Sequence, residues 1–542
     1  MSERSIQEAM NNIIEKTSAL WKNDKIKVLV MLSLVLQIVL IFFAPFRKRS
    51  HGIWLHRLLW LAYLGADYIS TLALGSILTD RYCNVGADLT KQTLTAFWAP
   101  FLLVHLGGPD NITSYSVEDN ELWLRHFFGV VVQVSVALVV LVLSMMKTTR
   151  LLVPSILIFI VGIIKFGGRT FALRAASTKQ IKHSAVKKDQ LAYLVSTYRD
   201  VSRPDAQSNG ETLSDISEAK FILLVYCYFF IFKPHIVGTL VTSAWQIRHL
   251  RMHNKEDIDF RFISIELSFF YDILHTKATV VHRMACRVIR IASLVSIMIA
   301  FYLFHTTEKR GYESSDLIIT YTLLSVALFL EFYSALHLVI SKWTVISLLR
   351  LNKKWTTTLA KLISRVENHI FCLGNKGQWS ERMGQYSLIK AVLKNKESNR
   401  FKKAWDFLFE GEESAKVSKI LEKTVIKHAK NLVEPLEQYG EYVDLITRMR
   451  SSWISNSTLD RYNLTEIKNK MKEETFEQSI MLWHMVTDIC YFVTNNAPRN
   501  SEQGQMREAL YRLSHDVPSH GETINDASRN RRNYNGGNNL RM

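Results

Sequence analysis

Long uncharged apolar blocks constrain this chain more than any other feature. A block of about 20 apolar residues crosses the hydrocarbon core of a bilayer as one α-helix. The first block, Ile26 to Phe46, carries no charge after Lys27 and lacks a small-residue cleavage site, so we interpret it as an uncleaved membrane helix rather than a signal peptide. Comparable blocks lie at Trp54–Thr79, Phe127–Met146, from Leu151 onward, Ile291–Phe304 and Leu317–Ile340. The pattern predicts an all-α polytopic membrane protein.

One apolar stretch is too short for a comfortable span. Leu94 to Leu106 holds only about a dozen apolar residues around Pro100, a length that favours a re-entrant or tilted short helix. Strong turn residues follow it, so we expect a short broken helix over residues 94–108. If this stretch crosses, there are seven spans and an external N-terminus. If it is re-entrant, there are six spans and an internal N-terminus, and the flanking charges favour neither.

The charge distribution points to a membrane surface. The formal net charge is +18, and Arg283, Arg287 and Arg290 recur at helical spacing before an apolar run. Such a basic collar places the preceding loop on the cytoplasmic side. We therefore expect contact with the lipid bilayer through its anionic cytoplasmic leaflet, together with unidentified protein partners. Nucleic acid is disfavoured because no basic-aromatic recognition module is present. The sequence does not distinguish the plasma membrane from an endomembrane.

The chain divides into segments by hydropathy and composition. A long helix over Phe262–Phe304 is expected to enter the membrane, and the region after Ser341 reads as amphipathic helix without a further span. The tail has few apolar residues to bury and reads as disordered. The expected segments are a polar N-terminal segment 1–25, a first membrane helix group 26–175, a basic cytosolic loop 176–261 with an interfacial or buried helix 219–232, the long helix and last two spans 262–341, a cytosolic helical region 342–494 and the tail 495–542.

Four charged side chains fall at or near membrane depth. Asp67 and Glu331 interrupt apolar blocks, while Lys165 and Arg169 stand toward the far end of another. Intramembrane charges either pair with one another or mark a transport pathway, and we favour pairing. Long basic side chains near a helix end also reach the interface by themselves.

Evidence for an enzyme is weak. His105 and Asp110 stand five residues apart, a spacing that resembles the acyltransferase pattern in which Asp orients a His general base. The intervening Gly-Gly-Pro reads equally well as a helix-ending turn. The five cysteines form no CxxC pair, and His484 with Asp488 offers too few ligands for zinc. No phosphate loop, dinucleotide fingerprint or metalloprotease motif is present, so we expect neither metal nor cofactor.

Several long strings resemble a plant family of membrane proteins that carries the domain of unknown function 4220. They cover roughly residues 50–370 and include Phe97–Asp110, Tyr115–Arg125, Gly167–Ser177, Phe270–His282 and Ile318–Trp343. Gly168 departs from the Gly-Glu-Arg-Thr of the family pattern, and Ile480–Phe492 is similar to the start of domain of unknown function 594. The family-motif residues are Trp98, Pro100, His105, Gly107, Gly108, Pro109, Asp110, Glu118, Asp119 and Asn120.

The resemblance implies a plant membrane protein and no activity, so three hypotheses remain. A membrane-anchored scaffold or signalling component fits the basic helical region after Ser341. A transporter or channel would use Asp67 and Glu331. An intramembrane acyltransferase-like enzyme would use His105 and Asp110. We favour the first and expect no enzymatic activity.

Overall fold

The computed structural model describes residues 24–50, 52–83, 89–145, 150–184, 196, 213–233, 260–351, 353–371, 382–385, 413–419 and 422–423. The chain forms two compact units, and nearly all of the helices belong to the first. Most of the predicted segment 1–25, the predicted 594-like stretch 480–492, His484, Asp488 and the tail 495–542 lie outside the described residues.

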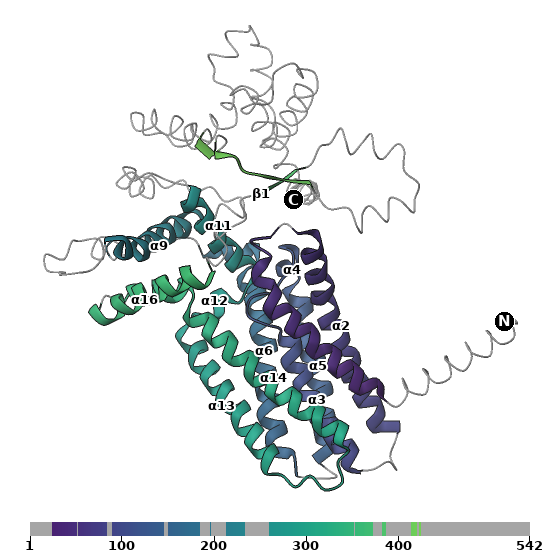
Figure 1. Ribbon diagram of the computed structural model, residues 1–542. Coiled ribbons are helices and arrows are strands. Elements are labelled where there is room, and N and C mark those ends of the chain that lie inside the picture. Colours follow the sequence, from purple (N-terminus) through teal and green to yellow (C-terminus); the bar gives the residue numbers. More distant parts are fainter. Residues whose placement is uncertain are drawn as a thin grey trace, which may run out of the picture. The chain divides into compact units, whose positions relative to one another are not determined.

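Membrane-length apolar helices dominate the first unit (Figure 1). Within the described ranges, six are long and apolar enough to cross a bilayer. Their outward sides carry exposed Val, Ile, Leu and Phe, as expected for helices solvated by lipid. The six are the N-terminal span Asp24–Phe46, which ends in the 3-10 turn η1 (Ala44–Phe46), and α2 (Ile53–Cys83), α5 (Trp123–Met145), α6 (Leu152–Ala175), α13 (Met284–Thr306) and α14 (Ser314–Val339). The prediction of an all-α polytopic membrane protein is confirmed.

The prediction of a short broken helix over 94–108 is wrong. Helix α3 runs unbroken from Leu89 to Gly107, with Pro100 inside it. Its 19 residues span about 28 Å, close to the thickness of the hydrocarbon core. Every residue from Gln92 to Pro109 is buried. Because other helices surround α3, it need not be apolar along its whole length. Hydropathy alone therefore underestimates the length of this helix.

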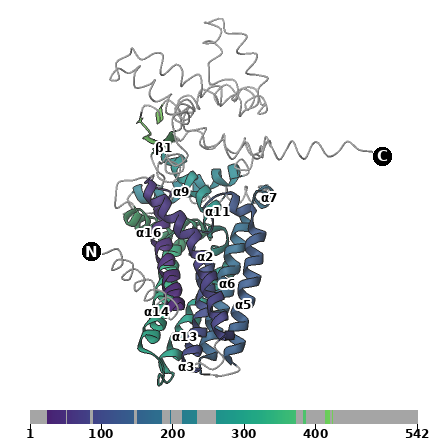
Figure 2. The same cartoon turned by 90° about the vertical axis from the view of Figure 1, so that its right-hand side faces the viewer.

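The ends of the N-terminal span lie at opposite ends of the bundle. Lys27 Nζ, at its start, lies 2.6 Å from Asp316 Oδ1 at the beginning of α14. At the other end, Arg47 donates to the Tyr115 carbonyl (2.7 Å) and Lys48 lies 3.3 Å from Asp272. With α3 included, consecutive helices run alternately up and down the bundle (Figures 1 and 2). This geometry matches the seven-crossing arrangement.

The expected long helix over Phe262–Phe304 is instead three helices. They are α11 (Phe260–His275), α12 (Ala278–Val281) and α13. The first break follows from competing hydrogen bonds, since the Lys277 backbone N–H donates to the Asp110 carbonyl (2.9 Å) and Thr276 Oγ1 accepts from the Ala278 N–H (3.1 Å). The second occurs at Arg283, whose ψ of 141° is extended. Helix α11 therefore ends before the membrane helix begins.

Further helices cover the end of the bundle at which α11 and α12 lie (Figure 1). They are α4 (Glu118–Glu121), α7 (Thr178–His183), α9 (Leu213–Phe232), α15 (Lys342–Leu349) and α16 (Lys354–Phe371). Helix α9 covers the predicted helix 219–232 and packs Tyr226 against Trp343 (5.8 Å between ring centroids) and Phe229 against Phe269 (5.4 Å). We call the end that holds the loop 108–117, α11, α12 and α15 the capped end.

The second unit contains a two-stranded antiparallel sheet among its described residues. Strands β1 (Arg382–Gln385) and β2 (Glu413–Lys416) pair with Met383 opposite Ala415. Both strands lie within the region 342–494 that was predicted to be helical, so they depart from that prediction.

Candidate functional site

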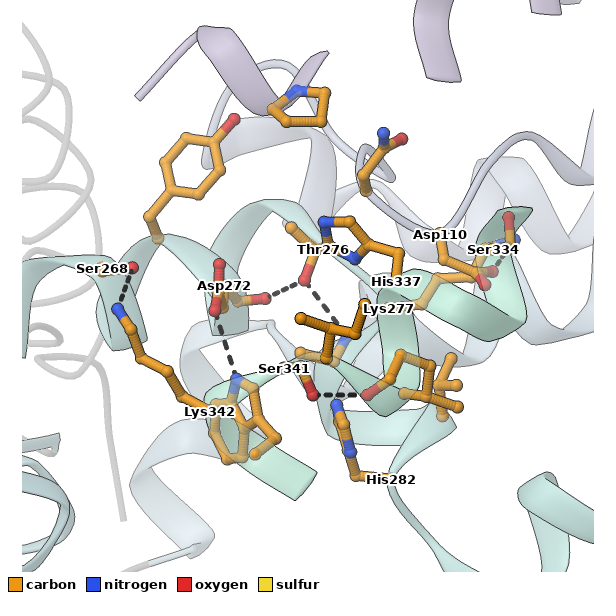
Figure 3. Close-up of a pocket in the computed structure, with 18 of the residues that line it drawn as sticks. Asp110, Ser268, Asp272, Thr276, Lys277, His282, Ser334, His337, Ser341 and Lys342 are labelled. Carbon is orange, nitrogen blue, oxygen red and sulfur yellow. Dashed lines mark hydrogen bonds and ion pairs between the residues drawn. The ribbon is translucent and has the colours of Figure 1, made fainter. Parts of the chain in front are cut away.

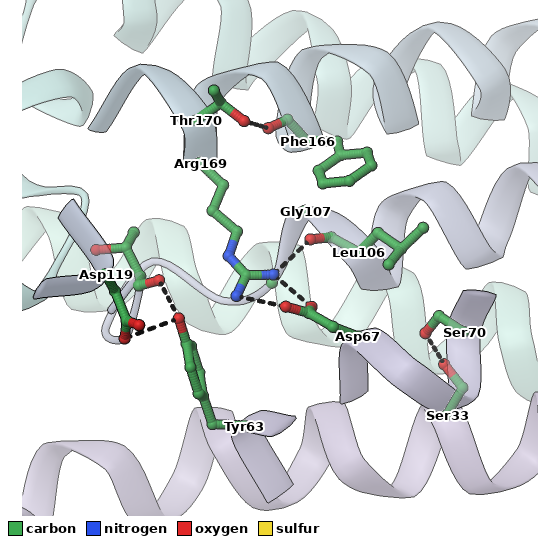
Figure 4. Close-up of polar contacts among 12 residues, drawn as sticks. Ser33, Tyr63, Asp67, Ser70, Leu106, Gly107, Asp119, Phe166, Arg169 and Thr170 are labelled. Carbon is green, nitrogen blue, oxygen red and sulfur yellow. Dashed lines mark hydrogen bonds and ion pairs between the residues drawn. The ribbon is translucent and has the colours of Figure 1, made fainter. Parts of the chain in front are cut away.

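The partly exposed carboxylate of Asp67 is paired with a buried arginine of another helix. Arg169 from α6 forms a two-pronged contact with Asp67 from α2, with Nη1–Oδ1 and Nη2–Oδ2 distances of 2.5 and 3.0 Å (Figure 4). Arg169 Nη1 also donates to the Leu106 carbonyl (3.0 Å), and its guanidinium lies 5.3 Å from the centre of the Tyr63 ring. In the chain, Gly168 stands where the family pattern has a glutamate next to Arg169. The partner comes from another helix instead.

A second ion pair joins α6 to α14. Lys165 contacts Glu331, whose side chain is only 3% exposed. The side chains of Lys165 and Arg169 therefore pair with carboxylates inside the protein. The alternative, in which each extends by itself to the membrane interface, is not what the structure shows. Both intramembrane carboxylates noted in the sequence are bound to basic side chains of a different helix.

Two glycines let α3 and α6 approach closely beside these pairs. A Cβ added at Gly107 would lie 2.7 Å from Lys165 Cβ and 2.9 Å from the Phe166 nitrogen. A Cβ at Gly162 would lie 2.7 Å from Leu103 Cβ. Small residues at such contacts are typical of packed membrane helices. The close approach is what brings Arg169 within reach of the Leu106 carbonyl at the end of α3.

The turn after α3 holds a third ionic cluster. Gly108 has φ of +63°, which suits glycine, and directs the chain toward Asp110. Asp110 contacts Arg290 of α13 and lies 3.6 Å from Lys277, whose Nζ also donates to the carbonyls of Gly107 (2.9 Å) and Gly108 (3.0 Å). This cluster fixes the end of α3 to the start of α13.

The protonation of the cluster follows from burial and charge. Burial opposes the charged form of Asp110, but Arg290 and Lys277 outweigh it and hold the pKa of this carboxyl below its usual range. Burial lowers the pKa of Lys277 to about 8, with Asp110 opposing the shift. At neutral pH the cluster is an ion pair between Asp110 and two cations.

Asp119 and Asn120 of the family motif hold the loop after α3 in place. Asp119 Oδ2 accepts the backbone N–H groups of Tyr115 (2.9 Å) and Ser116 (3.0 Å) and the Tyr63 hydroxyl (3.3 Å). Asn120 Nδ2 donates to the Leu274 carbonyl (2.9 Å). Glu118 is exposed.

The family-like strings Tyr115–Arg125 and Phe270–His282 meet in space, together with the residues just before the first of them. Besides the bond from Asn120, the Thr113 N–H donates to the His275 carbonyl (2.8 Å), and Ser114 Oγ donates to the Leu274 carbonyl (2.8 Å). The loop after α3 is thus bound to the end of α11, although more than 150 residues separate them in the chain. Asn120 of the first string and the end of the α11 part of the second string therefore belong to one interface.

His105 has a hydroxyl partner. Its Nδ1 lies 2.8 Å from Ser33 Oγ, which lies 2.8 Å from Ser70 Oγ. His105 and Asp110 line one small cavity of about 30 Å³, yet no hydrogen bond joins them in the described structure. Two further motif residues lie in the same helix as His105: Trp98 donates to Thr320 Oγ1 (2.9 Å), and Pro100 approaches α6 at Gly162. The spacing that resembles an acyltransferase therefore does not form an aligned His–Asp dyad here.

Among the described residues, no group of three or more His, Cys, Asp or Glu side chains is placed to hold a metal ion.

Comparison with known families supplies the identification. The model of "Domain of unknown function (DUF4220)" matches residues 60–392, more than half of the chain. The protein belongs to the DUF4220 family. No curated protein matches it, and no solved structure does.

The matched region of this DUF4220 protein contains the Asp67–Arg169 pair, the Lys165–Glu331 pair and the cluster around Asp110. Asp67, Lys165, Arg169 and Glu331 were identifiable from the sequence, whereas the contacts of Arg290 and Lys277 with Asp110 were not. Arg290 had been assigned only to the basic collar. The available signal was that Lys277 lies within a family-like string, Phe270–His282, that has no membrane-spanning role.

Proposed function

We propose that this DUF4220 member is a plant integral membrane protein that works as a membrane-anchored scaffold or signalling component. In this proposal the helical bundle is the anchor, and the helices of the capped end carry the working surface toward protein partners and the anionic cytoplasmic leaflet. The observation that carries the proposal is the pairing of the charges at membrane depth.

Paired charges favour an anchor over a conduit. Asp67 is bound by Arg169 and Glu331 by Lys165, each across two different helices. A carboxylate that transports a solute or a proton normally faces a water-filled path, or a partner from which it separates during transport. Here each carboxylate links helices, and the glycine contacts between α3 and α6 pack the space between them. Such a bundle suits a fixed platform.

The capped end is held firmly to that platform. Asp110 joins the loop after α3 to α13 and to Lys277, while Lys48 at the end of the N-terminal span contacts Asp272 of α11. Trp343 of α15 donates to Asp272 Oδ2 (3.2 Å). A platform of this kind fixes the orientation of surfaces that bind partners at the membrane.

Proximity labelling tests the proposal. A labelling enzyme fused to the C-terminus of the full chain should mark a reproducible set of proteins in its native cells. The control is the same enzyme on an unrelated multi-pass protein of the same membrane. A set distinct from the control, which shrinks when Asp110→Asn loosens the capped end, is the expected result. A set identical to the control's would refute the scaffold.

Transport is the second candidate because two cavities meet beside Asp110. A cavity of about 120 Å³ at the capped end and the 30 Å³ cavity beside His105 share Asp110 and Ser334 in their linings. Lys165 also lines the smaller cavity, so a polar route would lead from the capped end toward the buried pairs. Flux through reconstituted protein decides between the two functions.

A further inference from the structure

Helix α16 holds a row of large apolar side chains that are exposed. Trp355 is 62% exposed, Leu359 38% and Leu362 51%, and the half-buried Val366 continues the row. Successive members are four, three and four residues apart, so they lie along one face of the helix. Such an apolar row on a single helix marks a site of contact with a membrane or with another protein.

A different face of α16 is packed on the protein. Thr356, Ala360 and Ile363 are buried, and α16 contacts both α15 and α9. Each of these buried residues follows a member of the exposed row by a single position, which places the two faces about 100° apart around the helix. The exposed row is therefore not the face that attaches α16 to the rest of the protein.

The chain places α16 next to the end of the last membrane span. Helix α14 ends at Val339, whose side chain is 52% exposed, and only α15 and residues 350–353 separate α14 from α16. Figure 1 shows α16 running across the long axis of the bundle, with α9 on the side away from the membrane helices. Because α9 covers that side, the open side of α16 faces the level of the lipid headgroups.

Helix α15 fixes this position at the capped end. Ser341 caps its start by accepting the Thr344 backbone N–H (3.3 Å). Lys342 Nζ lies 3.5 Å from Ser268 Oγ of α11 (Figure 3). Since α15 also packs against α16, the depth of α16 follows from the depth at which α14 ends.

Basic side chains accompany the apolar row. Residues 353–371 contain four Lys and Arg residues and one Glu. Lys353 and Lys354, at the start of α16, have exposed side chains. A helix with tryptophan and leucine on one face and lysines beside them is typical of helices that lie in the plane of an anionic membrane surface.

We propose that α16 lies in the headgroup region of the anionic cytoplasmic leaflet, with Trp355, Leu359 and Leu362 among the upper acyl chains and Lys353 and Lys354 against lipid phosphates. A bilayer fits this row better than a protein partner does, because α16 follows a membrane span closely and its lysines match anionic headgroups. The inference rests on the proposed function, which turns the capped end toward this leaflet, and it names the helix that makes the contact.

Cysteine labelling of the full chain in nanodiscs measures the depth of α16. The discs hold one copy of the protein in phosphatidylcholine with phosphatidylserine. A water-soluble maleimide is added, and peptide mass spectrometry distinguishes the new cysteine from the five native ones. The test variant is Leu362→Cys, and the matched control is Thr357→Cys, on the opposite side of the same helix.

The inference reverses the order of reactivity that the protein alone would give. Leu362 is exposed and Thr357 only half-buried, so without a bilayer against α16 the cysteine at position 362 would react faster. With α16 in the leaflet, Leu362→Cys should react at least about tenfold more slowly than Thr357→Cys, because its apolar site is removed from water.

Lipid charge tests the part of the lysines. Raising the phosphatidylserine content should slow the labelling of Leu362→Cys further, by up to about fivefold for each lysine. The added changes Lys353→Gln and Lys354→Gln should remove this dependence. Lys179→Gln with Lys182→Gln makes the same charge change at two exposed lysines of α7 and should leave the dependence intact.

Leu359→Cys keeps the inference testable if Leu362→Cys does not fold, since it places the cysteine in the same row. Thermal unfolding of each variant in the same discs confirms that it is folded. Faster labelling in the row than at Thr357→Cys would overturn the inference, because the row would then be in water and open to a protein partner. Protection that does not change with phosphatidylserine would overturn it as well.

The outcome is separate from that of proximity labelling. Protection of the row together with a labelled protein set identical to the control's would overturn the scaffold and leave the lipid contact standing. Free labelling of the row together with a distinct protein set would overturn the lipid contact alone.

Discussion

The Asp67–Arg169 pair makes the sharpest prediction about stability. Replacing Asp67 with Asn keeps the shape of the side chain but leaves the Arg169 guanidinium, itself only 5% exposed, without its carboxylate. The Leu106 carbonyl and the Tyr63 ring remain, and neither carries a compensating charge. Removing one partner of a buried ion pair costs about 3–5 kcal/mol. Because the Asp67 side chain is 35% exposed, we place the loss near the lower end, about 3 kcal/mol.

Unfolding of the purified protein in mixed micelles by sodium dodecyl sulfate titration measures this loss. A change of about 3 kcal/mol lowers the folding equilibrium constant more than 100-fold. Glu118→Gln is the matched control, since that carboxylate is exposed and should tolerate the same isosteric change. The double variant Asp67→Asn/Arg169→Gln should lose less stability than the sum of the losses of the two single variants, with a coupling energy of about 1–3 kcal/mol.

Two results would refute the reasoning. An unchanged midpoint for Asp67→Asn would show that the pair contributes nothing to stability. Strictly additive losses in Asp67→Asn, Arg169→Gln and the double variant would show that the two side chains do not interact.

Three further predictions test other parts of the structure. Gly162→Ala should destabilise the folded protein by about 1–3 kcal/mol because the added Cβ would clash with α3. Gly167→Ala is the control, because the space around Gly167 is open and this change should not destabilise the protein. Unfolding midpoints measure both variants, and equal losses would contradict the close contact at Gly162. Burial lowers the pKa of Lys277 from 10.5 to about 8, so between these pH values the folded protein binds fewer protons than the unfolded protein. The free energy of unfolding of the wild type relative to Lys277→Met should therefore rise with pH in this range, as measured by unfolding at several pH values. A difference between the two proteins that does not change with pH would contradict this. Burial lowers the pKa of His275 from 6.5 to about 4, so acidification across that range should destabilise the wild type more than His275→Gln, and parallel pH profiles would contradict this.

The membrane architecture was predictable because apolar length is a strong and local signal. Each long block lies within or close to one helix, as for Trp54–Thr79 within α2, although α13 begins at Met284, seven residues before the block at Ile291. Apolar length failed to predict the full extent of α3. Neighbouring helices bury Gln92 and Thr93, so these polar residues can lie in a membrane-crossing helix. Apolar length failed again at Thr276 and Lys277, where bonds to a distant loop interrupt the helix.

The charged site was predictable only in part. The cost of a charge in the membrane singled out Asp67 and Glu331 and favoured paired carboxylates, and the structure pairs both. Which partner each would choose depends on the packing of α2, α6 and α14, and a single sequence carries no signal for that. The roles of Lys277 and Arg290 depend on a contact across more than 150 residues.

Flux measured in liposomes that contain the purified protein tests the central claim most directly. The claim is that the charges at membrane depth hold the bundle together and conduct nothing. Wild type, Asp67→Asn and Glu331→Gln should all give the flux of empty liposomes across a panel of ions and small solutes. Flux in the wild type that either substitution abolishes would contradict the claim and make those carboxylates part of a transport site.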